Sequence, residues 1–240
     1  MRNLYFLFCC WITLQPLYGQ TLWETGAVKG LWASPEEVHP ENNWEAQWIW
    51  LKEEENPMML SRKSFVLEEI PLKAVLHISA TSIYKLYVNG QYLVQGPARS
   101  APHHQSFDKI DISSLLEKGI NTLAVKVHYQ AGKQSYHFNA RPGLLAQLNL
   151  SFRTQQLILP TNESWKVKAD PSWKNDAPVI SRFQDLVNDK VDLRNAIEGW
   201  YNRTFDDQTW ASATRVYRNE GWPAQQKNNS AGATTLPWIN

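Results

Sequence analysis

The chain has 240 residues, with 24 Lys and Arg against 23 Asp and Glu and a formal net charge of +1. This near-zero charge gives no electrostatic reason to expect nucleic acid or an anionic membrane as a partner. The length suits one large or two small domains, and a hydrophobic fraction of 43% is ordinary for a globular protein.

Residues 1–19 are predicted to be an export signal. Arg2 supplies a positive charge, and Leu4–Leu14 is an apolar run that is too short for a confident membrane span. The only two cysteines, Cys9 and Cys10, lie inside this segment. We therefore expect a mature protein without disulfides, thiolate nucleophiles or Cys-ligated zinc, exported to a periplasm or to the extracellular space.

Residues 20–43 carry scattered prolines and polar residues without a clear period, which predicts an extended arm leading into the folded region. A first strand is predicted at Arg62–Leu67. Period-2 alternation then begins and recurs in short segments, which is typical of strands with one buried face. The predicted inward positions are Ala74, Leu76 and Ile78, then Leu86 and Val88, then Leu123, Val125 and Val127, then Leu144, Ala146, Leu148, Leu150 and Phe152.

In the longest alternating run, Gln147, Asn149 and Ser151 are expected to point outward. Two further short strands are predicted at Gln156–Leu159 and Trp165–Lys168. No segment shows a sustained helical period. Short strands at regular spacing with turn signals between them predict an all-β sandwich and argue against a βαβ fold.

The stretch from Tyr84 to Val127 has the strongest turn signals. Asn89-Gly90 is suited to the positive φ values of a tight hairpin turn. Asp111 is expected to cap a short helical turn, and Gly119 to end it in a left-handed conformation. A strand, an Asn-Gly turn, a polar loop, a helical turn and a second strand in this order are typical of galactose-binding-like β-sandwiches, which often bind sugars in glycoside hydrolases.

The pattern weakens after Pro178. Asp206–Trp210 is predicted to be a turn with a packing indole, and a short strand is predicted at Arg215–Tyr217. Residues 221–240 are polar and featureless until an apolar segment begins at Leu236, so we expect a disordered tail or linker that leads to the truncated start of a following domain.

Taken together, these motifs resemble the N-terminal, non-catalytic region of bacterial α-L-rhamnosidases. The resemblance covers roughly Trp44 to Ala213. It is carried by the segments Ala46–Trp50, Arg62–Phe65, Tyr84–Gly90, Gly96–Ser100, His104–Asp108, Arg141–Gln147, Gly199-Trp200 and Phe205–Trp210. It implies a galactose-binding-like jelly roll over residues 44–220.

Enzymes of that family carry an (α/α) barrel after their β domains, and its acidic residues perform the hydrolysis. This sequence contains no barrel-like series of amphipathic helices, so none of the family's catalytic residues can be assigned. We expect no hydrolytic activity from the chain alone, which is similar to a truncated or split member of the family.

Polar and aromatic residues near predicted strand ends are the best candidates for contact with a sugar. They are Arg99, His104, His128, Tyr129 and Arg141. Adjacent histidines at 103 and 104 lack the spacing of a helix-borne zinc site, so no metal ligand is assigned. Asp206 and Asp207 are neighbours with diverging side chains, which favours turn chemistry over a catalytic pair.

No cofactor is expected, with a structural calcium ion as the alternative, because such sandwiches often hold one through carboxylates and carbonyls. Asp170, Asp176, Asp185 and Asp189 are available, but their spacing singles out none of them.

Three hypotheses for function remain. The first is a carbohydrate-binding module that recognises rhamnose-containing glycans, with aromatic faces on apolar sugar surfaces and Arg, His and Asn on hydroxyls. The second is a purely structural module that packs against a separately encoded catalytic barrel, with an exposed apolar patch as its signature. The third, which is disfavoured, is an intact small glycoside hydrolase, because no convergent pair of carboxylates can be argued.

Overall fold

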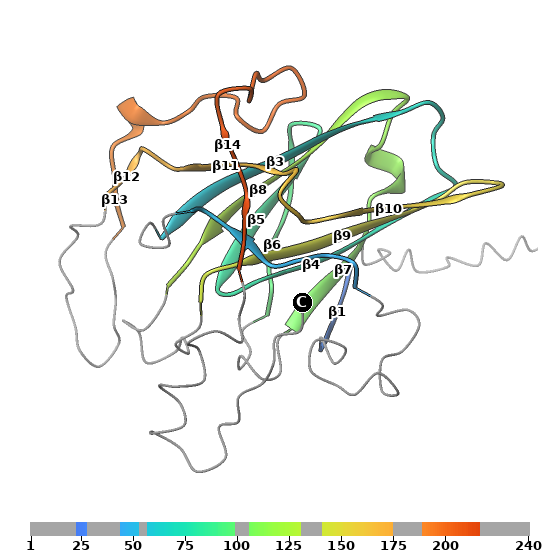
Figure 1. The fold of residues 1–240 in the computed structure, drawn as a ribbon, viewed down its shortest axis with the longest axis horizontal. Coiled ribbons are helices and arrows are strands. Elements are labelled where there is room, and N and C mark those ends of the chain that lie inside the picture. The colour runs from blue at the N-terminus through green and yellow to red at the C-terminus, as the bar shows by residue number, and fades with distance from the viewer. Residues whose placement is uncertain are drawn as a thin grey trace, which may run out of the picture.

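The computed structural model describes the backbone of residues 23–27 together with residues 44–52, 57–98, 106–130, 141–174 and 189–216 (Figure 1). Within these ranges the chain forms β-strands and two short 3-10 turns, η5 (Ser113–Leu115) and η6 (Leu193–Asn195). The prediction of an all-β sandwich is therefore confirmed. The predicted export signal, the tail at residues 221–240, and Arg99, His104 and Tyr217 lie outside the described residues.

The larger of the two main sheets has seven strands, all paired antiparallel. Their order is β1-β7-β4-β9-β2-β15, and β10 also pairs with β9. The strands are β1 (Trp23–Ala27), β2 (Ile49–Trp50), β4 (Lys73–Ala80), β7 (Ser106–Asp111), β9 (Leu144–Ser151), β10 (Gln156–Pro160) and β15 (Thr214–Arg215). Strand β1 falls within the predicted arm, so part of that arm extends the sheet.

The second sheet has six strands in the order β14-β11-β3-β8-β5-β6. They are β3 (Met58–Leu67), β5 (Ile83–Val88), β6 (Gln91–Gly96), β8 (Gly119–His128), β11 (Lys166–Ala169) and β14 (Ala211–Ser212). A separate two-stranded ribbon joins β12 (Trp173–Lys174) to β13 (Lys190–Val191) and lies at one end of the molecule (Figure 1).

The apolar core lies between the two sheets and takes residues from both. Ala74, Leu76 and Ile78 of β4 have no exposed surface, as their alternation predicted. Leu86 of β5 and Val125 of β8 belong to the same cluster from the opposite sheet. The period-2 pattern therefore identified the inward face of the central strands.

His77 and Gln147 lie on the outer face of the larger sheet and are buried, so the outward direction predicted for Gln147 does not expose it. His77 is 9% exposed because the Trp44 and Phe107 rings pack against it at 5.9 and 5.8 Å between centroids. Gln147 is buried because its Oε1 accepts the backbone N–H of Glu45 at 2.7 Å. The segment that enters the sandwich thus covers part of this face, which alternation within a strand cannot reveal.

The predicted turns are present. Asn89 and Gly90 have φ values of 52° and 92°, and the Asn89 side chain donates to the Leu115 carbonyl at 2.7 Å. The N-cap of η5 is Ile112 and not Asp111 as predicted, but Asp111, one residue earlier, accepts the N–H of Ser113 on its Oδ1 at 2.9 Å. Gly119 has a φ of 96°, but it begins β8 instead of directly ending the helical turn.

Strand β3 begins at Met58, earlier than the prediction of Arg62–Leu67. The missed residues are Met58–Ser61, which begin with Met58-Met59-Leu60, an apolar stretch without alternation. Leu60 lies on the outer face of the sheet, yet it is 1% exposed because Trp200 and Trp210 pack over it. A strand buried on both faces loses the period-2 signal on which the prediction depended.

Candidate functional site

The described candidates for sugar contact lie where β8 ends and β9 begins. His128 is the last residue of β8, Tyr129 follows it, and Arg141 precedes β9. The β4–β5 turn holds both segments, because Thr81 Oγ1 donates to the Arg141 carbonyl at 2.8 Å and Ser82 Oγ accepts the Gln130 N–H at 3.0 Å. The backbone at these positions is therefore fixed by one short turn.

The side chains of His128 and Tyr129 do not converge. The His128 ring packs against Trp173 with 4.5 Å between centroids, and its Nδ1 lies 3.2 Å from Gln130 Nε2. The Tyr129 ring instead meets the buried Trp50 edge-on at 6.1 Å, against the core. His128 and Tyr129 thus leave opposite faces of the sheet end, as neighbours on a strand do.

Trp173 is a site residue that the sequence analysis missed. It lies in β12 of the two-stranded ribbon, is half-buried, and leaves part of its indole open to solvent beside His128. A signal for it exists in the sequence, because Asp170-Pro171-Ser172 is a turn-forming sequence that fixes the residue after it.

Asp170 anchors this turn. Its Oδ1 accepts the N–H and the hydroxyl of Ser172 at 2.9 and 2.6 Å, and its Oδ2 accepts the Lys126 ammonium at 2.6 Å. The Asp170 N–H also donates to the Met58 carbonyl at 3.0 Å, which ties the turn to β3. The turn that positions Trp173 is therefore already ordered, so ligand binding would carry no entropic cost for ordering it.

The environment of Asp170 favours its charged form. Burial alone would raise the pKa of this carboxyl, but the hydrogen bonds from Lys126 and Ser172 outweigh burial and lower the pKa below its usual value of 3.8. A calcium ion at Asp170 would have to displace Lys126. Asp189 is exposed, and the other two predicted calcium candidates lie outside the described residues. In the part of the chain that the structure describes, no three His, Cys, Asp or Glu residues gather as a metal site.

We expect Asp170→Asn to lower the free energy of unfolding at pH 7 by about 1 kcal/mol, because the amide keeps the turn but loses the charge pair with Lys126, which is partly exposed. Because the folded pKa of Asp170 is depressed, its stabilisation is present above pH 3.8 and is lost as pH falls through the folded pKa. Urea unfolding measured from pH 7 to pH 2 should show that the free energy of unfolding falls less at acid pH in the variant than in the wild type.

The matched control is Asp192→Asn. Asp192 also has a lowered pKa, but it pairs with Arg194 at the surface, where solvent screens the charges. An Asp170→Asn variant as stable as the Asp192→Asn variant at pH 7 would contradict the anchoring role.

Asp206 and Asp207, the only adjacent acidic pair considered for catalysis, are engaged in local structure. Asp206 Oδ1 accepts the Gln208 N–H at 3.0 Å, as expected for turn chemistry. Asp207 Oδ2 accepts from Arg62 Nε at 2.9 Å. The surrounding segment places Trp200, Tyr201, Phe205 and Trp210 over the outer face of the six-stranded sheet, and we refer to these four residues as the aromatic cap.

Comparisons with known proteins establish the family. Residues 69–234, more than half of the chain, match the model of the alpha-L-rhamnosidase N-terminal domain. The chain belongs to this family. An alpha-L-rhamnosidase of Alteromonas sp. (strain LOR) is 24% identical over 219 residues, which are 79% of this chain and 23% of that protein. An alpha-L-rhamnosidase of Formosa agariphila is 23% identical over 192 residues, 70% of this chain and 20% of that protein.

Solved structures agree with this family. The GH78 family rhamnosidase of Bacillus sp. GL1 is 33% identical, with a TM-score of 0.65 over 72% of this chain and 18% of that chain. The alpha-L-rhamnosidase of Dictyoglumus thermophilum shares the fold, with a TM-score of 0.60, 23% identity, and coverage of 74% of this chain and 22% of that chain. This rhamnosidase N-terminal domain therefore spans about a fifth of each relative.

Among the described residues of this domain, no helix is long and apolar enough to cross a membrane.

Proposed function

We propose that this chain is a non-catalytic carbohydrate-binding region of an α-L-rhamnosidase-like glycoside hydrolase and that it has no hydrolytic centre of its own. Hydrolysis needs two carboxyl groups that face one glycosidic bond across a gap. The carboxylates of Asp170, Asp206 and Asp207 serve turns and ion pairs instead. The names of the relatives point to rhamnose-containing glycans as the ligand class.

The observation that carries this proposal is the partly buried Trp173 held against His128 at the end of the sandwich. An indole face suits the apolar C–H surface of a sugar ring, and imidazole and amide groups suit its hydroxyls. His128 and Gln130 supply these polar groups beside Trp173. Arg99, His104, Tyr129 and Arg141 remain candidates for contact with the sugar.

We also propose the segment limits and the location that the sequence indicates. Residues 1–19 would direct export to the periplasm or the extracellular space, and residues 20–43 would form the arm. The sandwich region would span residues 44–220, which is supported by β2 to β15 lying within it, with a linker at residues 221–240.

Calorimetric titration of the full chain with L-rhamnose and rhamnose-bearing oligosaccharides tests this function, together with an assay of aryl-rhamnoside hydrolysis. We expect saturable binding without turnover. His128→Ala should weaken binding about tenfold, since it removes both a polar contact and the support of Trp173.

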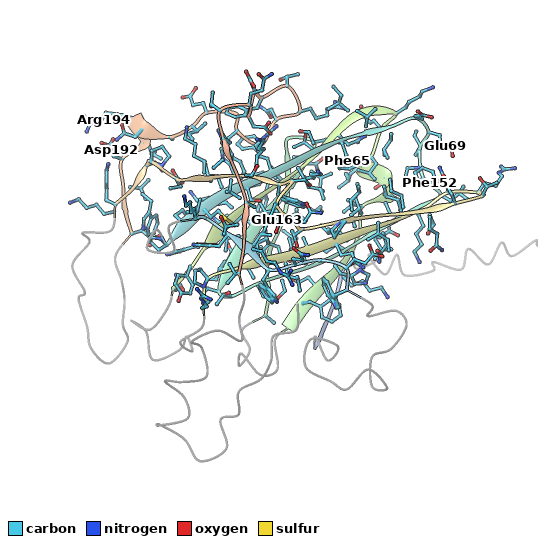
Figure 2. All side chains as sticks on the ribbon, viewed as in Figure 1. Phe65, Glu69, Phe152, Glu163, Asp192 and Arg194 are labelled. Atoms are coloured by element: carbon cyan, nitrogen blue, oxygen red, sulfur yellow. The ribbon has the colours of Figure 1, made fainter. Side chains whose placement is uncertain are left out.

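Arg141→Ala should also weaken binding, because Arg141 precedes β9 at the same end of the sandwich as His128, and its matched control is Arg153→Ala. Arg153 is exposed in the β9–β10 turn. Its neighbour in the chain, Phe152, lies at the end of the molecule opposite Asp192 and Arg194 (Figure 2). Binding that is lost equally in both arginine variants, or turnover by the wild-type chain, would refute the proposed site.

One observation favours domain packing as a second function. Val66 and Ile120 are cross-strand partners at the far end of β3 and β8, and they are 68% and 57% exposed. Ile70 and Leu72 in the β3–β4 turn are also exposed, so apolar side chains gather at the end away from Trp173. Such a patch fits contact with another domain of a rhamnosidase. This function would be favoured if the chain bound no saccharide and instead bound the catalytic barrel of a relative, and if Val66→Lys abolished that binding.

A further inference from the structure

The six-stranded sheet carries a one-sided distribution of charge. Its strands contain six basic residues and no Asp or Glu, a count taken directly from their sequences. The basic residues are Arg62 and Lys63 of β3, Lys85 of β5, Lys126 of β8, and Lys166 and Lys168 of β11. The seven-stranded sheet, in contrast, includes Glu24, Asp108 and Asp111. The chain's net charge of +1 therefore conceals a basic sheet.

Strand register gathers three of these lysines on one row. Lys85 is opposite Lys126, Lys126 is opposite Leu60, and Leu60 is opposite Lys168. Directly opposed residues of antiparallel strands share a face, and the three intervals between these four strands span about 14 Å. Tyr84, Leu86, Val125, Val127 and Val167 alternate with these lysines and are buried in the core, so the row lies on the outer face.

The lysines of this row lie beside aromatic groups, and Leu60, between Lys126 and Lys168, is covered by Trp200 and Trp210 of the aromatic cap. Two residues after Lys85, Tyr87 stacks on Tyr201 of the aromatic cap at 4.9 Å. Two residues after Lys126, His128 packs against Trp173. Lys85 and Lys168 are exposed, whereas Lys126 is partly exposed and paired with Asp170. Positive charges near the partly buried Trp173 fit a ligand that has both sugar rings and negative charges.

We propose that the outer face of this sheet, from Trp173 to the aromatic cap, binds an acidic oligosaccharide, with Lys85 and Lys168 contacting its anionic groups and Trp173 contacting a ring. This inference rests on the proposed carbohydrate-binding function and adds the ligand class. The acidic groups would be carboxylates or sulfate esters, which place the same charge on a sugar. Asp170 and Asp207 are already paired with Lys126 and Arg62, so they leave the exposed lysines to the ligand.

The test compares three oligosaccharides of equal length by calorimetry at low salt: an oligogalacturonide, a sulfated heparin-derived oligosaccharide, and a neutral rhamnose-bearing oligosaccharide. The protein is the full chain and a Lys85→Gln/Lys168→Gln double variant. Lys118→Gln is the control, since Lys118 is exposed next to Gly119, at the other end of β8 from His128. Thermal unfolding verifies that each variant is folded.

We expect the wild-type chain to bind at least one of the two acidic probes more tightly than the neutral one, and salt to weaken that binding by screening. The double variant should lose about tenfold in affinity for the acidic probe and keep its affinity for the neutral one. Trp173→Ala should weaken binding of both kinds. Preference between the galacturonide and the sulfated probe then identifies the anionic group.

Two outcomes would overturn the inference while leaving the proposed function intact. One is binding of the neutral probe with no gain for either acidic probe, and the other is a double variant that binds acidic probes as the wild type does. Equal affinity for an oligo-glutamate peptide of matched charge, which has no sugar rings, would also overturn it, since the attraction would then be electrostatic alone. Absence of binding to all three saccharides would refute both the proposed function and this inference.

Discussion

Replacing Arg62 by alanine is expected to lower the free energy of unfolding by about 3–5 kcal/mol, the cost of breaking a buried ion pair from one side. The Arg62 side chain is fully buried, and its Nε donates to Asp207 at 2.9 Å. Its guanidinium also donates to the carbonyls of Trp200, Asn202 and Phe205. Removing it takes the guanidinium donor from the Asp207 carboxylate and from these carbonyls, of which Asn202 keeps the Phe205 N–H, so urea unfolding should show a much lower midpoint.

Arg62→Lys separates charge from geometry. A lysine keeps the positive charge but cannot reach several acceptors in one plane, so we expect it to recover less than half of the loss. Arg194→Ala is the control, because Arg194 forms its ion pair with Asp192 at the surface and should leave the midpoint unchanged. A fully stable Arg62→Lys variant would show that the planar guanidinium is not what holds the segment.

The reason for so large an effect is that Arg62 joins distant parts of the chain. It lies on β3, while its partners lie between Trp200 and Asp207, and its guanidinium lies 5.1 Å from the centre of the Phe205 ring. This attachment holds the aromatic cap over Leu60 and Ala124. The cap in turn forms one border of the proposed saccharide surface, so loss of Arg62 should weaken binding of acidic oligosaccharides as well as stability.

The sequence predicted correctly those structural features that are determined by residues close together in the chain. Alternation at Ala74, Leu76 and Ile78 and the Asn89-Gly90 turn were read correctly, because a strand face and a tight turn are determined within a few residues. Burial of Gln147 was missed because its cause, the segment beginning at Trp44, lies about a hundred residues away. Contacts at such separation leave no period in the sequence.

In the candidate site, too, the local features were predicted and the tertiary contacts were not. The positions of His128 and Tyr129 at a strand end were predicted from β8, but their opposite directions and the pairing of His128 with Trp173 depend on the tertiary fold. The basic face was equally hidden, since overall composition averages it against acidic residues elsewhere. Only the strand register places Lys85, Lys126 and Lys168 in one row.

The second large effect concerns Gly96, whose backbone lies close to two buried side chains of the core. Gly96 ends β6, and a Cβ at this position would overlap Asp108 Oδ2 and come within 2.8 Å of the Tyr84 hydroxyl. Tyr84 donates to Asp108 Oδ2, both residues are buried, and burial and the Asp108 charge raise the pKa of Tyr84 so that it stays a donor. The bond joins β5 of one sheet to β7 of the other.

Gly96→Ala is therefore expected to lower the free energy of unfolding by about 1–3 kcal/mol, since the added methyl must displace a buried, hydrogen-bonded carboxylate. Gly119→Ala is the matched control: its φ of 96° strains an alanine, but a Cβ there meets nothing within 4 Å. If packing against Tyr84 and Asp108 is the cause, urea unfolding will show a lower free energy of unfolding for Gly96→Ala than for Gly119→Ala. Tyr84→Phe should then reduce the loss of stability caused by Gly96→Ala, because it removes one of the two crowded oxygens. The reverse ranking would show that backbone conformation, and not the Tyr84–Asp108 contact, makes glycine necessary in this sandwich.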